Sequence, residues 1–146
     1  MKDSTSEYRA LRQQTLQLLC QFDAGNEDVA LITEMNFDED ASSSIDPNKK
    51  ALLLANEIWA DRLAADAQIE ALTPEWPIYR QPLIDRNILR LARYEIVTGM
   101  TPPIVAIDEA IELARTFSTE KSPTFVNGVL DNLFHQSDSA EETNGD

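Results

Sequence analysis

The chain has 146 residues and a mass of 16.4 kDa, close to the commonest size of one folded domain. It carries a net charge of −14 and has only four glycines and one cysteine, Cys20. A single cysteine excludes an internal disulfide framework and a zinc site of several thiolates. The longest fully apolar run, residues 51–55, is too short to span a bilayer, and no apolar secretion segment precedes it. We therefore expect a cytoplasmic protein without membrane segments.

The negative charge is concentrated in two segments. Residues 21–48 contain eight acidic and no basic residues, and residues 122–146 contain five acidic and no basic residues. The rest of the chain is nearly neutral. The net charge alone therefore does not exclude binding to nucleic acid, because the distribution of charge matters more than its sum.

The N-terminal segment predicts a helix over residues 4–22. Ser4 and Glu7 have the spacing of a capping box, and the segment from Asp23 to Asn26 is a stop signal in which Gly25 or Asn26 can take the left-handed conformation. One stripe of this helix is predicted to be buried: Leu11, Thr15, Leu18, Leu19 and Phe22.

The following segment predicts a short helix over residues 29–35 and an acidic, serine-rich surface loop over about 36–46. Asp46 as N-cap and Pro47 at the first helical position then begin a long helix that runs to about Leu72. Its predicted buried side consists of Leu52, Ala55, Trp59, Leu63 and Ile69.

A connector over residues 73–77 carries two prolines and Trp76, which we expect to cover an edge of the core. Residues 82–98 predict a central helix that contacts partners on more than one side and ends at Gly99. Apolar residues cover much of its circumference: Ile84, Ile88, Leu89, Leu91, Ala92 and Ile96.

Two further helices complete the prediction. The first spans about 103–117 and presents one apolar stripe, made of Ile104, Ile107, Ile111, Ala114 and Phe117. The second begins at Ser122-Pro123 and buries Val126, Val129, Leu130 and Leu133. No segment predicts a strand, so the fold class is all-α, with one domain over residues 1–136 and a disordered acidic tail over 137–146.

No group of residues forms a recognisable catalytic or metal-binding motif. The one histidine, His135, is expected at the surface near the tail, and Cys20 is expected to pack. Asp108, Glu109 and Glu112 cluster on one helix, but bundle sites for two metals also use Glu-x-x-His motifs, and none is present. The sequence predicts no enzyme activity, no metal and no cofactor.

Three arginines of the central helix, Arg86, Arg90 and Arg93, share one side of it. They are either internal partners of carboxylates or a stripe for phosphates or an acidic partner. We expect Arg90 itself to be structural and paired with Glu109 or Glu112. Gly128, inside the last helix, predicts close packing of a neighbouring helix or of a ligand.

Three motifs resemble the NusB family of bacterial transcription antitermination factors. They read ILRLARYE over residues 88–95, VAIDEAIELA over 105–114 and FVNGVLD over 125–131. Residues 12–22, RQQTLQLLCQF, are similar to the family's first helix at Arg12, Gln17 and Leu19.

The resemblance implies an all-helical domain of two packed three-helix subdomains without catalytic activity. It implies a factor that binds single-stranded boxA RNA together with NusE, a small-subunit ribosomal protein, within the antitermination complex of RNA polymerase on ribosomal RNA operons. The residues that carry over are Arg9, Arg12 and Phe125 for RNA, and Asp85 and Arg86 for NusE. Phe125 would stack on an unpaired base.

The chain departs from the family at its basic N-terminus, which is reduced to Arg9 and Arg12, and at Cys20, where an aromatic is usual. Fewer cations mean weaker binding to the RNA backbone. The alternative function is therefore an acidic protein–protein interaction module or homodimer with little RNA affinity of its own. A helical domain of the kind fused to ribosomal RNA methyltransferases is a third alternative, disfavoured because no catalytic domain follows residue 146.

Overall fold

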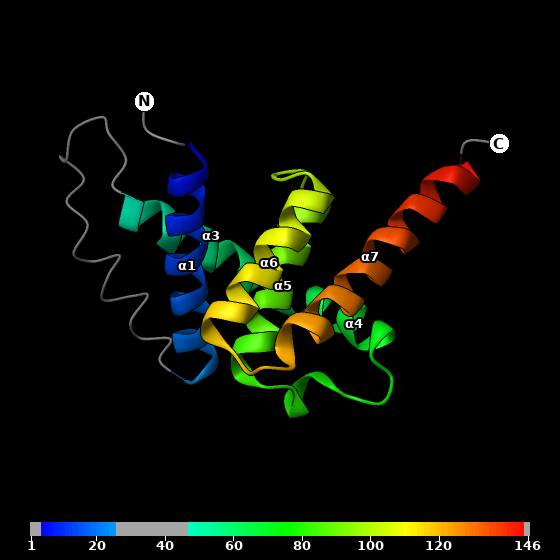
Figure 1. Ribbon diagram of the computed structural model, residues 1–146, viewed down its shortest axis with the longest axis horizontal. Helices are drawn as coiled ribbons and strands as arrows, with labels where there is room; N and C mark the ends of the chain where they lie inside the picture. The colour runs from blue at the N-terminus through cyan, green and yellow to red at the C-terminus, as the bar shows by residue number, and fades with distance from the viewer. Residues whose placement is uncertain (1–3, 26–46, 145–146) are drawn as a thin grey trace. The chain divides into compact units, whose positions relative to one another are not determined.

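The computed structural model of the chain describes residues 4–25 and 47–144, and all the regular elements in these ranges are helices (Figure 1). The predicted all-α class is confirmed. The chain divides into two compact units, Met1–Asp61 and Arg62–Asp146, and each is described by itself. Within the described ranges, no helix is long and apolar enough to cross a membrane.

The first unit contains α1 (Ser4–Asp23) and α3 (Pro47–Ala60), which pack against each other. Phe22 of α1 meets Trp59 of α3 edge to face, with ring centroids 5.9 Å apart. Gly25 has φ +97°, the left-handed conformation predicted for the turn that ends α1. The predicted helix at 29–35, the acidic loop at 36–46 and the cap at Asp46 lie outside the described residues.

The prediction of a single long helix from residue 47 to 72 is wrong, because the helix is interrupted at Asp61. α3 ends at Ala60, and α4 (Arg62–Leu72) begins the second unit. Leu52, Ala55 and Ile69 are buried as predicted, but Leu63 is 77% exposed. The interruption explains why Leu63 is exposed. Because α4 is a separate helix, the spacing of buried residues along α3 does not predict which residues of α4 are buried.

The second unit consists of α4, the short 3-10 helix η1 (Ile78–Arg80), α5 (Leu83–Val97), α6 (Pro103–Phe117) and α7 (Ser122–Asn144). α5 is its centre and contacts α4, α6 and α7, which confirms the prediction of a helix with partners on several sides. Its core residues are almost completely buried: Ile88, Leu89, Leu91 and Ala92. Gly99, with φ +73°, follows the last turn of α5.

The predicted buried stripe of α6 is partly wrong. Ile104 is 67% exposed and Phe117 is 37% exposed, whereas the buried face is made of Ala106, Ile107, Ala110, Leu113 and Ala114. Three of these are alanines, whose small side chains let α5 and α7 pack closely against α6. Ile104 and Phe117 lie in the first and last turns of α6, at the ends of this face.

α7 begins at Ser122 as predicted and buries Val126, Val129, Leu130 and Leu133. It continues to Asn144, past the point where the sequence predicts the helix to end.

We expect residues 137–146 to be dispensable for folding, because this acidic segment offers no apolar side chain larger than alanine to a core. Truncation after Gln136 should leave the thermal unfolding midpoint within about 2 °C of the full chain, since a change of 1 kcal/mol shifts that midpoint by roughly 4 °C in domains of this size. A larger fall in a calorimetric scan would show that the last turns of α7 contribute to the core.

Candidate functional site

The two candidate RNA-binding arginines of α1 differ in exposure. Arg9 is exposed, whereas Arg12 is buried, with 6% of its surface accessible. The Arg12 guanidinium lies over the ring of Tyr8, 5.9 Å from its centroid, and that ring is 53% exposed. This geometry is a cation–π contact. Arg9 is thus the more accessible of the two arginines.

Phe125 lies in the first turns of α7 and is half-buried. Its ring meets Trp76 edge to face, with centroids 4.6 Å apart and an interplanar angle of 64°. Trp76 thus covers an edge of the core, as predicted. The contact fixes the orientation of the Phe125 ring, which is the candidate for stacking on a base.

The surface of α7 is open at Gly128. Gly128, one turn after Phe125, is exposed, and a Cβ added there would meet nothing within 4 Å. The expectation that a neighbouring helix packs against Gly128 is therefore wrong within the described residues. Lys121, one turn before Phe125, is exposed, and within the described part of the chain its ammonium has no hydrogen-bond or ion-pair partner.

The candidate partner residue Asp85 is an interior group, with 2% of its surface exposed. Its carboxylate accepts hydrogen bonds from the hydroxyl of Ser118 and, at 2.9 Å, from that of Ser122. Ser122 Oγ in turn accepts the backbone N–H of Thr119 at 3.2 Å. Asp85 therefore ties the first turn of α5 to the loop between α6 and α7 and to the start of α7.

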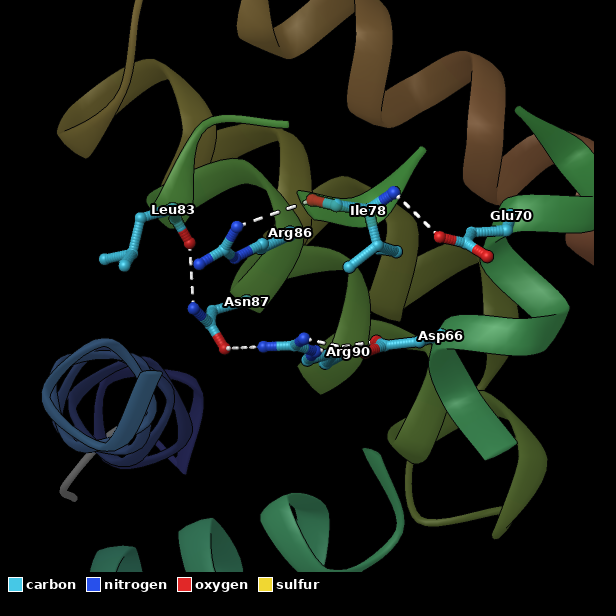
Figure 2. Close-up of polar contacts among 7 residues, drawn as sticks. All are labelled: Asp66, Glu70, Ile78, Leu83, Arg86, Asn87 and Arg90. Atoms are coloured by element: carbon cyan, nitrogen blue, oxygen red, sulfur yellow. Dashed lines mark hydrogen bonds and ion pairs between the residues drawn. The ribbon is translucent and has the colours of Figure 1, made fainter. Parts of the chain in front are cut away.

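The second candidate partner residue, Arg86, is half-buried and donates a long hydrogen bond of 3.4 Å from Nη1 to the carbonyl of Ile78 (Figure 2). It therefore links α5 to η1.

Arg90 is structural, as predicted, and a carboxylate that the sequence did not indicate, that of Asp66, is its partner, whereas the candidate Glu112 pairs with Arg115. The Arg90 guanidinium donates from Nε and Nη2 to both carboxylate oxygens of Asp66, each at 2.8 Å, and from Nη1 to Asn87 Oδ1 at 3.0 Å (Figure 2). Only 4% of Arg90 is exposed. The carboxylate comes from α4 because that helix, like α6, packs against α5.

Arg93 donates to Gln68 Oε1 at 2.9 Å, so it also contacts α4. Glu112 instead pairs with Arg115 on its own helix. The internal reading of the three arginines of α5 is therefore supported, and they do not form an unpaired stripe for phosphates.

Nothing in the described residues resembles a catalytic or metal centre. His135 is exposed and lies 3.7 Å from the carboxylate of Asp131, one turn away on α7. Within the described ranges, no group of three histidine, cysteine or acidic side chains could hold a metal ion. Cys20 is half-buried in α1.

An exposed apolar turn between α5 and α6 was not anticipated from the sequence. Glu95 is buried and accepts the Thr101 hydroxyl at 2.8 Å, and the Thr101 N–H donates to the Glu95 carbonyl at 3.2 Å. These bonds fix a turn whose apolar side chains are 42–67% exposed: Val97, Met100, Ile104 and Val105. The sequence does carry a signal for this turn: Gly99 and Pro102-Pro103 end one helix and begin the next, and the apolar residues lie directly beside them.

The candidate residues divide between the two units. Arg9 and Arg12 belong to the first unit, and Phe125, Asp85 and Arg86 belong to the second. The structure brings Phe125 together with Trp76 and removes Asp85 from the surface.

The part of the chain that the structure describes is a helical protein whose exposed side chains include aromatic, cationic and apolar groups. Residues 9–135 match the NusB family model, and the chain belongs to the NusB family. It is 42% identical over 127 residues to the transcription antitermination protein NusB of Solibacter usitatus, an alignment that covers 84% of this chain and 85% of that protein. It is 38% identical over 122 residues to NusB of Sulfurimonas denitrificans, with 82% and 90% covered.

Solved structures agree. T. maritima NusB superposes with a TM-score of 0.71 at 34% identity, with 85% of this chain and 87% of that chain covered. A structure of antitermination factors NusB and NusE in complex with dsRNA matches in fold, with a TM-score of 0.72 at 22% identity and coverage of 90% and 98%.

Proposed function

We propose that this chain is an antitermination factor that acts in the cytoplasm, without catalysis, by binding boxA-type single-stranded RNA together with NusE during ribosomal RNA transcription. Membership of the NusB family supports the role, and one similar fold was solved with NusE and RNA. The observation that carries the RNA-binding part is the half-buried Trp76–Phe125 pair, next in sequence to the unpaired cation Lys121 and the open helix surface at Gly128.

The chemistry of this surface suits an unpaired base. An aromatic ring held by a second ring can stack on any base, and cations beside it neutralise the phosphate backbone. In the first unit, considered by itself, Arg9 is an exposed cation and the Arg12 guanidinium lies over the half-exposed Tyr8 ring. The binding energy available to the chain alone is small, because its net charge of −14 repels RNA. NusE must therefore supply much of the affinity.

The exposed apolar turn between α5 and α6 is the surface that best suits NusE. Asp85 and Arg86 are engaged in hydrogen bonds within the second unit, whereas Val97, Met100 and Ile104 present apolar area to a partner. Contiguous exposed apolar side chains on a fixed turn are typical of protein–protein interfaces. A basic ribosomal protein also complements the acidic chain. The same turn supports the alternative function, a protein-interaction module or homodimer with little RNA affinity.

A titration with boxA-type RNA, with and without NusE at two salt concentrations, separates the two functions. We expect weak binding by the chain alone, with a salt slope near −1.4 if Arg9 and Lys121 each contact about one phosphate at about −0.7 per phosphate. We expect much tighter binding by the complex with NusE. Phe125→Ala should weaken RNA binding by the complex roughly tenfold or more, since stacking contributes about 1–3 kcal/mol per base.

Phe117→Ala is the control, because this α6 phenylalanine is also partly exposed but, within the described residues, its ring packs on no second aromatic ring. Equal RNA binding by wild type and Phe125→Ala would reject the stacking surface. NusE association without RNA binding by the complex would favour the interaction module, and dimerisation of the chain alone would identify the homodimer.

A further inference from the structure

The connector between α4 and α5 presents an aromatic side chain and a cation to solvent. Tyr79, in η1, is 77% exposed, and Arg80 next to it is exposed as well. An exposed aromatic beside an exposed arginine is the pairing that single-strand binding proteins use, the ring for a base and the guanidinium for a phosphate.

The backbone under Tyr79 is held on both sides. The Ile78 N–H donates to Glu70 Oε1 of α4 at 3.0 Å, and the Ile78 carbonyl accepts from Arg86 of α5, as Figure 2 shows. Gln81, which is 3% exposed, donates from Nε2 to the Trp76 carbonyl at 3.0 Å. A ligand that binds here therefore meets a largely ordered loop and loses little affinity to ordering it.

Arg80 differs from the other described arginines of this unit. Arg86, Arg90 and Arg93 donate to groups of α4 and η1, and Arg115 pairs with Glu112. Arg62 also makes an internal interaction. In the part of the chain that the structure describes, no hydrogen bond or ion pair involves the guanidinium of Arg80. Its five donors remain for a ligand.

The connector is continuous with the surface at Phe125. Trp76 precedes Tyr79 by three residues and packs directly on the Phe125 ring. Three residues span at most about 11 Å between Cα atoms. Tyr79 therefore lies close enough to the Trp76–Phe125 pair for one single strand to reach both.

We propose that Tyr79 and Arg80 form a second nucleotide site, in which Tyr79 stacks on a base neighbouring the one on Phe125 and Arg80 binds a phosphate between them. This inference rests on the proposed function, because it extends the RNA path of that function along the connector. It assigns a binding role to a loop that is otherwise only a link between two helices.

The test measures boxA-type RNA binding by the complex with NusE, using fluorescence anisotropy at several salt concentrations. We expect Tyr79→Ala to weaken binding about tenfold or more and Tyr79→Phe to remain within about twofold of wild type, because phenylalanine keeps the stacking face. Arg80→Gln should reduce the steepness of the salt dependence by about 0.7. Leu63→Ala is the matched control, since Leu63 is also 77% exposed in this unit, and it should have no effect.

RNA carrying 5-bromouridine gives an independent readout, and photo-crosslinks in the peptide that contains Tyr79 would support the site. If wild type and Phe125→Ala behave as proposed but Tyr79→Ala binds like wild type, the second site is refuted and the proposed function stands. If the wild-type complex binds no RNA, the proposed function itself fails. If Tyr79→Ala weakens only NusE association, the loop is a protein contact and the nucleotide site is overturned.

Discussion

Replacing Arg90 by alanine should lower the free energy of unfolding by about 3–5 kcal/mol, the usual cost of removing one partner of a buried ion pair. The fork of Arg90 holds both carboxylate oxygens of Asp66 and the amide oxygen of Asn87. The Arg90 side chain is 5% exposed and that of Asp66 is 18% exposed. Removal of the Arg90 guanidinium would therefore leave the Asp66 carboxylate without this partner and with little access to water. Urea unfolding followed by circular dichroism measures the change.

Arg115→Ala is the matched control, because Arg115 also pairs with a carboxylate, that of Glu112, but its side chain is 62% exposed. Exposed pairs contribute about 0–1 kcal/mol, so this variant should unfold close to wild type. Arg90→Lys should recover only part of the stability, since an ammonium cannot hold both oxygens of Asp66 in the same geometry. An Arg90→Ala variant as stable as Arg115→Ala would contradict the structural role.

The helical class, the positions of most helix ends and the core of α5 and α7 follow from local patterns. Gly25 and Gly99 adopt the left-handed conformations that the stop signals required, and Pro47 and Ser122 begin helices as predicted. These signals act within a few residues, so the sequence carries them directly. The break at Asp61 has no proline or glycine beside it, which is why the periodicity of α3 was extended wrongly into α4.

Partners distant in sequence could not be predicted in the same way. Arg90 was expected to pair with α6, but Asp66 is 24 residues earlier, on α4. Spacing along one helix identifies which residues share its face, and it does not identify which of several helices lies opposite. The contact of Trp76 with Phe125 is of the same kind, because it joins a connector to a helix almost 50 residues later.

Exposure was the property of the candidate site least accessible to sequence reasoning. Arg12 and Asp85 matched positions that the family resemblance assigns to RNA and NusE, yet both are more than nine-tenths buried. For a charged residue at the start of a helix or within an amphipathic helix, the neighbouring sequence does not indicate whether the side chain is exposed to a partner or buried in an internal contact. Phe125, in contrast, lies in a specific motif, and its partial exposure is compatible with the stacking role.

Asp85→Ala is expected to destabilise the second unit by about 3 kcal/mol, since hydrogen bonds to charged groups contribute about 1.5 kcal/mol or more each and two would be lost. The hydroxyls of Ser118 and Ser122 both point at this carboxylate and lie 33 and 37 residues away in sequence. Asp85 is also in the first turn of α5, where the helix dipole favours a negative charge. Thermal unfolding should therefore begin at a lower temperature in this variant.

The same substitution distinguishes an internal role of Asp85 from the NusE contact that the family resemblance implies. If the role is internal, Ser122→Ala should reproduce part of the loss, and the double variant should lose less than the sum because the two residues share one hydrogen bond. Arg86→Gln, at the next position, leaves the Asp85 carboxylate and both of its serine partners in place and should therefore not reproduce the loss seen with Asp85→Ala. If instead Asp85→Ala unfolds like wild type but associates more weakly with NusE, its carboxylate acts at the partner surface. That result would place the NusE contact at the start of α5, at the opposite end of this helix from the exposed apolar turn.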